Sequence, residues 1–193
     1  MDTAEVTALV EESAKRAGLV WVRRHAGPDD RGGAPAPGAR GGVAEPARPM
    51  WHLWQDGRAY LLTGGSEQPC PAGLDADGVT AEVTVASKDT GARLVSWLAA
   101  VSEVSPGSAQ WDELVPLLQA KRLNAPDGSD APARWARECR LLELRPTGQV
   151  LETPDAPLPG SHAAPAPATP ATTPVPRPWQ LTGWLRRRGE GRR

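Results

Sequence analysis

Residues 49–65, PMWHLWQDGRAYLLTGG, constrain the fold more than any other stretch of this 193-residue chain. Two apolar runs flank Asp56-Gly57, a pair that readily adopts the left-handed backbone angles of a two-residue hairpin turn. In the first run, Trp51 and Leu53 alternate with His52 and Trp54. A strand of this sequence therefore has two chemically different faces. The stretch therefore predicts a β-hairpin.

The other periodic segments predict four further strands and two or three helices. Alternating or β-branched runs indicate strands at residues 19–24, 79–87, 92–104 and 140–145. Helical spacing indicates helices at residues 2–16, 108–122 and 132–139, with Ser108 as the N-cap of the second. Pro116 predicts a kink or an early break in that helix, because proline lacks a backbone donor. The expected fold is mainly β (α+β), with six strands in an antiparallel meander or barrel.

Composition divides the chain into ordered and flexible parts. Residues 25–48 and 147–193 are rich in Gly, Pro and Ala and hold few large apolar side chains, so they cannot offset the entropy of ordering. We expect residues 1–24 to form an N-terminal helix and first strand, and residues 49–146 the rest of the domain. Residues 25–48 are then a flexible insertion, and residues 147–193 a disordered linker with an Arg-rich tail. A solubilising tail is favoured over membrane contact.

Charge and cysteine usage exclude several classes of function. A formal net charge of −1 argues against a nucleic-acid-binding domain. Cys70 and Cys139 are far apart, and neither CxxC nor HExxH is present, so no metal site is predicted. The N-terminus is acidic where a secretory signal is basic, and no apolar run approaches a membrane span. We expect a cytoplasmic protein with two reduced thiols.

The loop after the hairpin is the first candidate binding site. Gly64 and Gly65 let backbone N–H groups approach a phosphate, and the hydroxyls of Thr63 and Ser66 flank them. An ordinary turn is the alternative interpretation. A second candidate is the turn between the two long strands, where Ser87, Lys88 and Arg93 offer hydroxyl and cationic donors to a phosphate; its alternative is a solvated hairpin tip.

Three aromatic residues of the hairpin are ambiguous. Trp51 and Trp54 lie on opposite faces of the predicted strand, so at most one lines a ligand cavity if the other is in the core. His52 lies between them, but no Ser or Cys has a context that makes it a nucleophile for this base. A packed or edge histidine is favoured. At the end of the second helix, the helix dipole alone accounts for Lys121 and Arg122.

The order of these elements resembles the flavin-binding split-barrel proteins related to pyridoxamine 5′-phosphate oxidase. The resemblance covers residues 19–146 and is carried by the hairpin PMWHLWQDGRAYLLTGG and by PGSAQWDEL followed by AKR, a helix common in members of actinobacterial type. It implies a six-stranded antiparallel split barrel with one or two peripheral helices. It also implies a homodimer that binds flavin mononucleotide (FMN), or in some subfamilies a deazaflavin, between its subunits.

The resemblance also assigns residues to the cofactor. Thr63 falls where the family often has a phosphate-contacting Ser or Thr, but residues 64–70 lack the basic residue that commonly follows. Lys88 and Arg93 are hypothesised to replace that residue. The predicted cofactor-binding set is Trp51, Thr63, Gly64, Gly65, Ser66, Ser87, Lys88 and Arg93.

Two classes of function stay open at this point. One is a flavin- or deazaflavin-binding oxidoreductase whose small-molecule substrate and catalytic residues are unassigned, because no acid or base in the sequence demands a particular reaction. The other is a cofactor-free split-barrel module for binding or interaction. The glycine pair and nearby indoles favour the first, and the missing basic residue after Thr63 favours the second.

Overall fold

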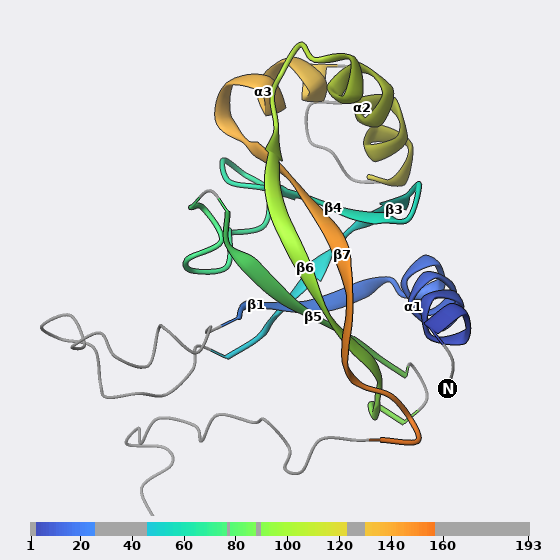
Figure 1. Cartoon of the computed structure of the whole chain (residues 1–193). Helices are drawn as coiled ribbons and strands as arrows, with labels where there is room; N and C mark the ends of the chain where they lie inside the picture. Colours follow the sequence, from blue (N-terminus) through green and yellow to red (C-terminus); the bar gives the residue numbers. More distant parts are fainter. Residues whose placement is uncertain (1–2, 26–45, 77, 88–89, 123–129, 157–193) are drawn as a thin grey trace, which may run out of the picture. The chain divides into compact units, whose positions relative to one another are not determined.

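The computed structural model describes residues 3–25, 46–76, 78–87, 90–122 and 130–156, which all belong to one compact unit, Met1–Ser161 (Figure 1). Most of the predicted insertion and most of the predicted linker and tail, residues 26–45 and 157–193, lie outside the described residues. The described part contains three helices and seven strands: α1 (Thr3–Arg16), β1 (Leu19–Arg24), β2 (Arg48–Trp51), β3 (Leu53–Gln55), β4 (Arg58–Thr63), β5 (Thr80–Ala86), β6 (Arg93–Val104), α2 (Ala109–Lys121), α3 (Ala131–Glu138) and β7 (Arg140–Glu152). None of these helices is long and apolar enough to cross a membrane.

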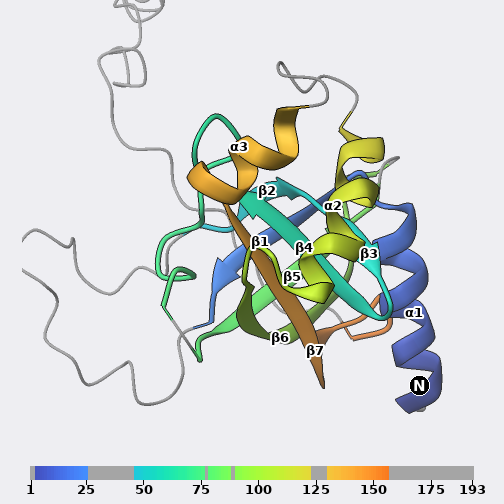
Figure 2. The same cartoon turned by 90° about the horizontal axis from the view of Figure 1, so that it is seen from above.

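All seven strands form one antiparallel sheet in the order β2-β1-β5-β6-β7-β4-β3. Strands β2 and β3 stand at opposite ends of this order, yet only His52 separates them in the chain. The sheet must therefore curl until its two edges approach each other. Figure 2 shows β2 leading into β3 beside β4, and Figure 1 shows α2 and α3 beside one end of the long pair β6 and β7. The predicted mainly β (α+β) class is confirmed.

The predicted count of six strands is wrong, because the first strand of the hairpin is divided at His52. Trp51 pairs with Leu19 of β1, whereas Leu53 pairs with Tyr60 of β4. At the division, the Gln68 side chain accepts a hydrogen bond from the Trp51 N–H (2.9 Å) and donates one to the Trp51 carbonyl (2.8 Å). The amide of Gln68 thus replaces a neighbouring strand where the two edges of the sheet meet.

The turn of the predicted hairpin is confirmed. Asp56 and Gly57 have φ angles of 49° and 73°, the left-handed values that a two-residue turn needs at both central positions. Leu53, Trp54 and Gln55 then pair in register with residues of β4. The long hairpin of β5 and β6 and the Ser108 N-cap are also confirmed, since the Ser108 hydroxyl accepts a hydrogen bond from the Trp111 N–H.

The two faces of β4 serve two separate apolar clusters. Leu61 points into the first cluster, inside the curled sheet, where Trp54 and Trp97 meet edge to face with ring centroids 6.3 Å apart. Tyr60 and Leu62 point into the second cluster, which also contains Trp111, Leu118 and Trp135 of the helices. Trp51 packs against the second cluster, which confirms that Trp51 and Trp54 lie on opposite sides.

Two element boundaries differ from the prediction. Helix α2 continues through Pro116 to Lys121, so the early break is wrong; one lost backbone hydrogen bond is outweighed by the buried Val115 and Leu118 on either side. The last strand continues to Glu152 instead of ending at residue 145. Its extension pairs with β6 through register shifts on either side of Trp97. Pro146, which cannot donate a backbone hydrogen bond, lies beside one of these shifts.

His52 joins the division between β2 and β3 to the end of α1. Its Nε2 donates to the Ala14 carbonyl at 2.9 Å, and its buried Nδ1 has no hydrogen-bond partner. Burial lowers the pKa of His52; the bond to Ala14 opposes this, and the charge of Lys121 adds to it. Burial therefore favours the neutral form of the His52 ring in the folded protein.

We predict that the His52 ring makes folding pH-dependent. The unfolded chain takes up a proton on His52 below about pH 6.5 and the folded chain resists it, so the free energy of unfolding falls by up to about 1.4 kcal/mol per pH unit there. Urea unfolding from about pH 7.5 to about pH 5, a range on both sides of that pKa, should show this slope in the wild type. His52→Gln retains a donor for Ala14 and should lose it. Equal slopes in both proteins would contradict the prediction.

Candidate functional site

The two predicted groups of site residues lie at opposite ends of β6. Thr63 pairs with Arg140 at the start of β7, next to the end of β6 at Val104, whereas Arg93 is at the start of β6. A strand of 12 residues spans roughly 36–40 Å at about 3.3 Å per residue. One small ligand within a single chain therefore cannot contact both groups. Lys88 lies outside the described residues.

The loop that follows β4 uses its polar groups internally. The buried Thr63 hydroxyl donates to the Arg140 carbonyl at 3.4 Å, and the Gly64 N–H donates to the Gln68 carbonyl at 3.0 Å. The Gly64 carbonyl accepts from the Glu67 N–H and from the Cys139 thiol. Ser66 is exposed. Much of the hydrogen-bonding capacity expected to face a phosphate is thus engaged within the protein.

The glycine pair is explained by packing against the start of β7. A Cβ atom on Gly64 would lie 3.2 Å from the Glu138 carbonyl oxygen, and one on Gly65 would lie 3.2 Å from the Cys139 sulfur. Both glycines also have positive φ angles, 90° and 55°. The loop therefore needs glycine to approach the end of α3 closely, and both positions face protein atoms.

The same loop inserts a carboxylate between two arginines. The Glu67 side chain is only 1% exposed. Its Oε1 accepts hydrogen bonds from Arg134 Nη2 at 3.0 Å and from Trp135 Nε1 at 2.9 Å. Its Oε2 lies 2.8 Å from Arg122 Nη2, an ion pair without hydrogen-bond alignment. Cations therefore do stand beside the predicted phosphate loop, and Glu67 is bound to them.

The electrostatics of this cluster favour the ionised carboxylate. Burial works to raise the pKa of Glu67, but the hydrogen bonds from Trp135 and Arg134 and the charges of Arg122 and Arg134 outweigh it, and the pKa lies below its usual value. The Arg122 guanidinium also lies over the Trp51 ring, 5.2 Å from its centroid. Trp51 is thus positioned by Arg122 and by the second apolar cluster.

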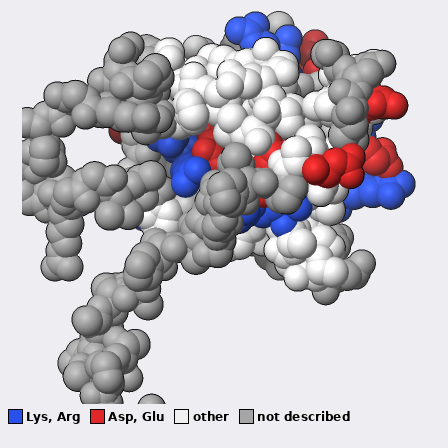
Figure 3. Space-filling model, turned by 60° about the horizontal axis from the view of Figure 1, so that its bottom comes forward, with Lys and Arg blue, Asp and Glu red and all other residues white. Residues whose placement is uncertain are grey.

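The other group of predicted residues surrounds the start of β6. Arg93 Nε donates to both carboxylate oxygens of the buried Glu152, at 2.8 and 2.7 Å, and Ser96 donates to the same carboxylate. Ser87 lines a groove of about 500 Å³ between α1 and the ends of β5 and β6, with Ser13, Ala17 and Leu94 among its other walls. Ion pairs such as Arg93–Glu152 and Arg23–Glu82 are consistent with the mixed basic and acidic side chains in Figure 3.

Glu67, Arg134 and Trp135 were not predicted as site residues. Arg122 stood out only as a cation at a helix end. No periodicity relates position 67 to positions 122, 134 and 135, which come together only when α2 and α3 pack on the sheet. The one local signal is an acidic residue directly after a glycine-rich turn, and that signal is common in exposed loops.

Solved structures that are similar to this chain include three proteins. HutZ, a heme storage protein from Vibrio cholerae, aligns with a TM-score of 0.49 and 12% identity over 76% of this chain and 93% of that chain. A putative general stress protein 26 from Jannaschia sp. CCS1 gives 0.44 and 14% over 74% of each chain. A putative general stress family protein from Xanthomonas campestris gives 0.47 and 18% over 83% and 95%.

No protein family matches the sequence, and no curated protein matches it either. At these identities and TM-scores, the three solved structures assign no ligand or activity to this chain.

We predict that Glu67 contributes strongly to stability. Glu67→Ala leaves Arg122 and Arg134 without their shared carboxylate, so the free energy of unfolding should fall by about 3 kcal/mol, as expected when one partner of a buried ion pair is removed. Because the pKa of Glu67 is lowered on folding, this contribution is present above about pH 4.5 and is lost as pH falls through the folded value. Urea unfolding at pH 7 and at lower pH measures both effects.

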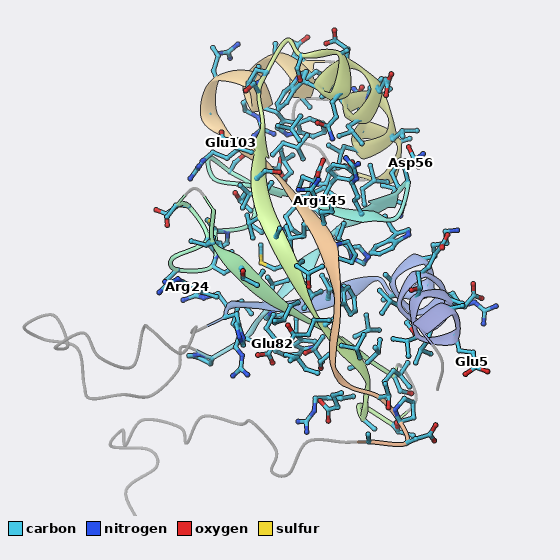
Figure 4. The ribbon with its side chains drawn as sticks, viewed as in Figure 1. Glu5, Arg24, Asp56, Glu82, Glu103 and Arg145 are labelled. Carbon is cyan, nitrogen blue, oxygen red and sulfur yellow. The ribbon has the colours of Figure 1, made fainter. Side chains whose placement is uncertain are left out.

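A matched control is Glu103→Ala. Glu103, labelled in Figure 4, pairs with Arg140 at the same end of the sheet, but both side chains are 36% exposed. Its loss should cost about 0–1 kcal/mol. Equal losses from the two substitutions would show that burial gives Glu67 no special role.

Proposed function

We propose that the described domain is a split-barrel binding module that works without a flavin. The observation that carries this proposal is the Glu67 carboxylate between Arg122 and Arg134. In the family that the sequence resembles, a cation beside this loop serves a cofactor phosphate. Here both neighbouring guanidinium groups contact an anion that the chain itself supplies.

The residues predicted to hold a flavin do not fit it as a set. Gly64 and Gly65 pack against Glu138 and Cys139, and Arg93 is held by Glu152 at the far end of β6. One face of the Trp51 ring lies beneath Arg122.

A flavin- or deazaflavin-dependent oxidoreductase is the second candidate, and the groove beside α1 favours it. Its volume of about 500 Å³ is within the range of small-molecule sites, and Val85 and Leu94 give it apolar walls. Ser87 and Ser13 supply hydroxyls there. A cofactor in this groove would use the start of β6 and not the loop after β4.

We further propose that the domain forms a homodimer through the outer face of β1. Val20 and Val22 of this strand are buried inside the sheet, whereas Leu19 and Trp21 point outward and are 51% and 42% exposed. Exposed Pro49 of β2 pairs with Trp21 and extends this apolar surface. Large apolar side chains grouped on one face are typical of association surfaces.

We predict that the purified protein does not bind FMN. It should show no flavin absorbance band in the visible, and neither FMN nor a deazaflavin should change its tryptophan fluorescence, because the arginines beside the loop already hold Glu67. Saturable FMN binding would contradict the proposal. If such binding weakened in Lys88→Ala and Arg93→Ala, the second candidate would replace it.

We predict that Trp21→Ser weakens self-association. The substitution removes the largest apolar group from the outer face of β1 without touching the core. Light scattering after size exclusion should report a dimer for the wild type and a concentration-dependent shift toward monomer for the variant. Leu117→Ser is the matched control, because Leu117 is 40% exposed on α2. A monomeric wild type would refute the dimer.

A further inference from the structure

We propose that Arg122, Arg134 and Trp135 form a receptor for the carboxylate group of a ligand, and that Glu67 closes this receptor from within the chain. The inference deepens the proposed function and rests on it, since it explains how a domain without a flavin phosphate stabilises the cations near its loop. An external carboxylate binds when the Glu67 side chain is absent.

The geometry of the receptor matches a carboxylate. Arg134 and Trp135 direct two N–H donors at one oxygen, and Arg122 approaches the other oxygen from the end of α2. Guanidinium and indole N–H groups only donate hydrogen bonds, so the receptor selects an acceptor with two oxygens over a neutral donor. The three donors come from two helices that pack in the second apolar cluster, which fixes their positions.

The receptor has more donor capacity than Glu67 uses. Arg122 Nε and Trp51 Nε1 are both buried and lack a hydrogen-bond partner. The Arg122 guanidinium lies over the ring that carries the second of these donors, 5.2 Å from its centroid. Glu67 Oε2 makes an ion pair with Arg122 without hydrogen-bond alignment. The tethered Glu67 side chain therefore leaves these buried donors without an acceptor, and buried donors without acceptors carry a free-energy cost.

An untethered carboxylate is free to adopt the alignment that Glu67 lacks. The Glu67 backbone is held by its N–H bond to the Gly64 carbonyl, and the preceding glycines pack closely on Glu138 and Cys139. These constraints fix where the Glu67 side chain begins, and so limit the angle at which Oε2 meets Arg122. Acetate has no such constraint, and its heavy atoms match those that Glu67→Ala removes.

The test is rescue of the full-length Glu67→Ala variant by acetate. Its unfolding temperature is measured in sodium acetate and in sodium chloride of equal ionic strength at pH 7. Acetate should raise it by about 3–5 °C over chloride once the acetate concentration exceeds the dissociation constant about tenfold. The wild type should show no difference between the two salts, because Glu67 occupies the receptor.

Two variants locate the effect. Adding Arg122→Ala to Glu67→Ala should abolish the acetate-specific rise, and Glu103→Ala should show none, since its ion pair is exposed. If Glu67→Ala does not fold in chloride, refolding from urea is compared in the two salts, and recovery only in acetate supports the receptor. No acetate effect on the variant, or an equal effect on the wild type, would overturn the inference.

These outcomes are separate from those that test the proposed function. FMN binding by the wild type would remove the proposed function while leaving acetate rescue of the variant to be judged by itself. Conversely, a colourless wild type whose Glu67→Ala variant ignores acetate retains the proposed function and loses the receptor.

Discussion

The structure depends on a buried contact between one carboxylate and two guanidinium groups from different helices. Glu67 joins the loop after β4 to Arg122 at the end of α2 and to Arg134 in α3. These segments are distant in sequence, and among the described residues no backbone pairing connects the two helices to the loop. Charges in such a setting are tolerated when they are paired and hydrogen-bonded, so the three segments are constrained to meet in one geometry.

The residue that follows Glu67 closes the sheet, so one short loop carries both constraints. Gln68 pairs with Thr63 through the backbone and bonds the Trp51 backbone with its side-chain amide. Glu67 and Gln68 therefore point to two different partners, the helices and the meeting edges of the sheet. Gly64 and Gly65 make this arrangement accessible, because their positive φ angles turn the chain against Glu138 and Cys139.

Local sequence patterns account for the individual helices, strands and turns. Contacts between residues distant in sequence account for the features that the sequence could not show. The Asp56-Gly57 turn, the long hairpin of β5 and β6 and the Ser108 cap depend on neighbouring residues, and all three were predictable. The division at His52 depends on Gln68 and Ala14, which no strand pattern indicates. For the same reason the tight turn of the glycine loop was predictable from its residues, but the pairing of Glu67 with Arg122 and Arg134 was not.

An internal anion changes what this kind of loop can do. A glycine turn beside arginines attracts an oxyanion whether that anion is part of a ligand or part of the protein, because the same N–H donors and charges act on both. When the anion is tethered, its local concentration is high, and a free competitor must overcome that advantage. Glycines and cations near a strand end therefore indicate an anion site, but the burial of a neighbouring Glu decides whether that site is open to solvent.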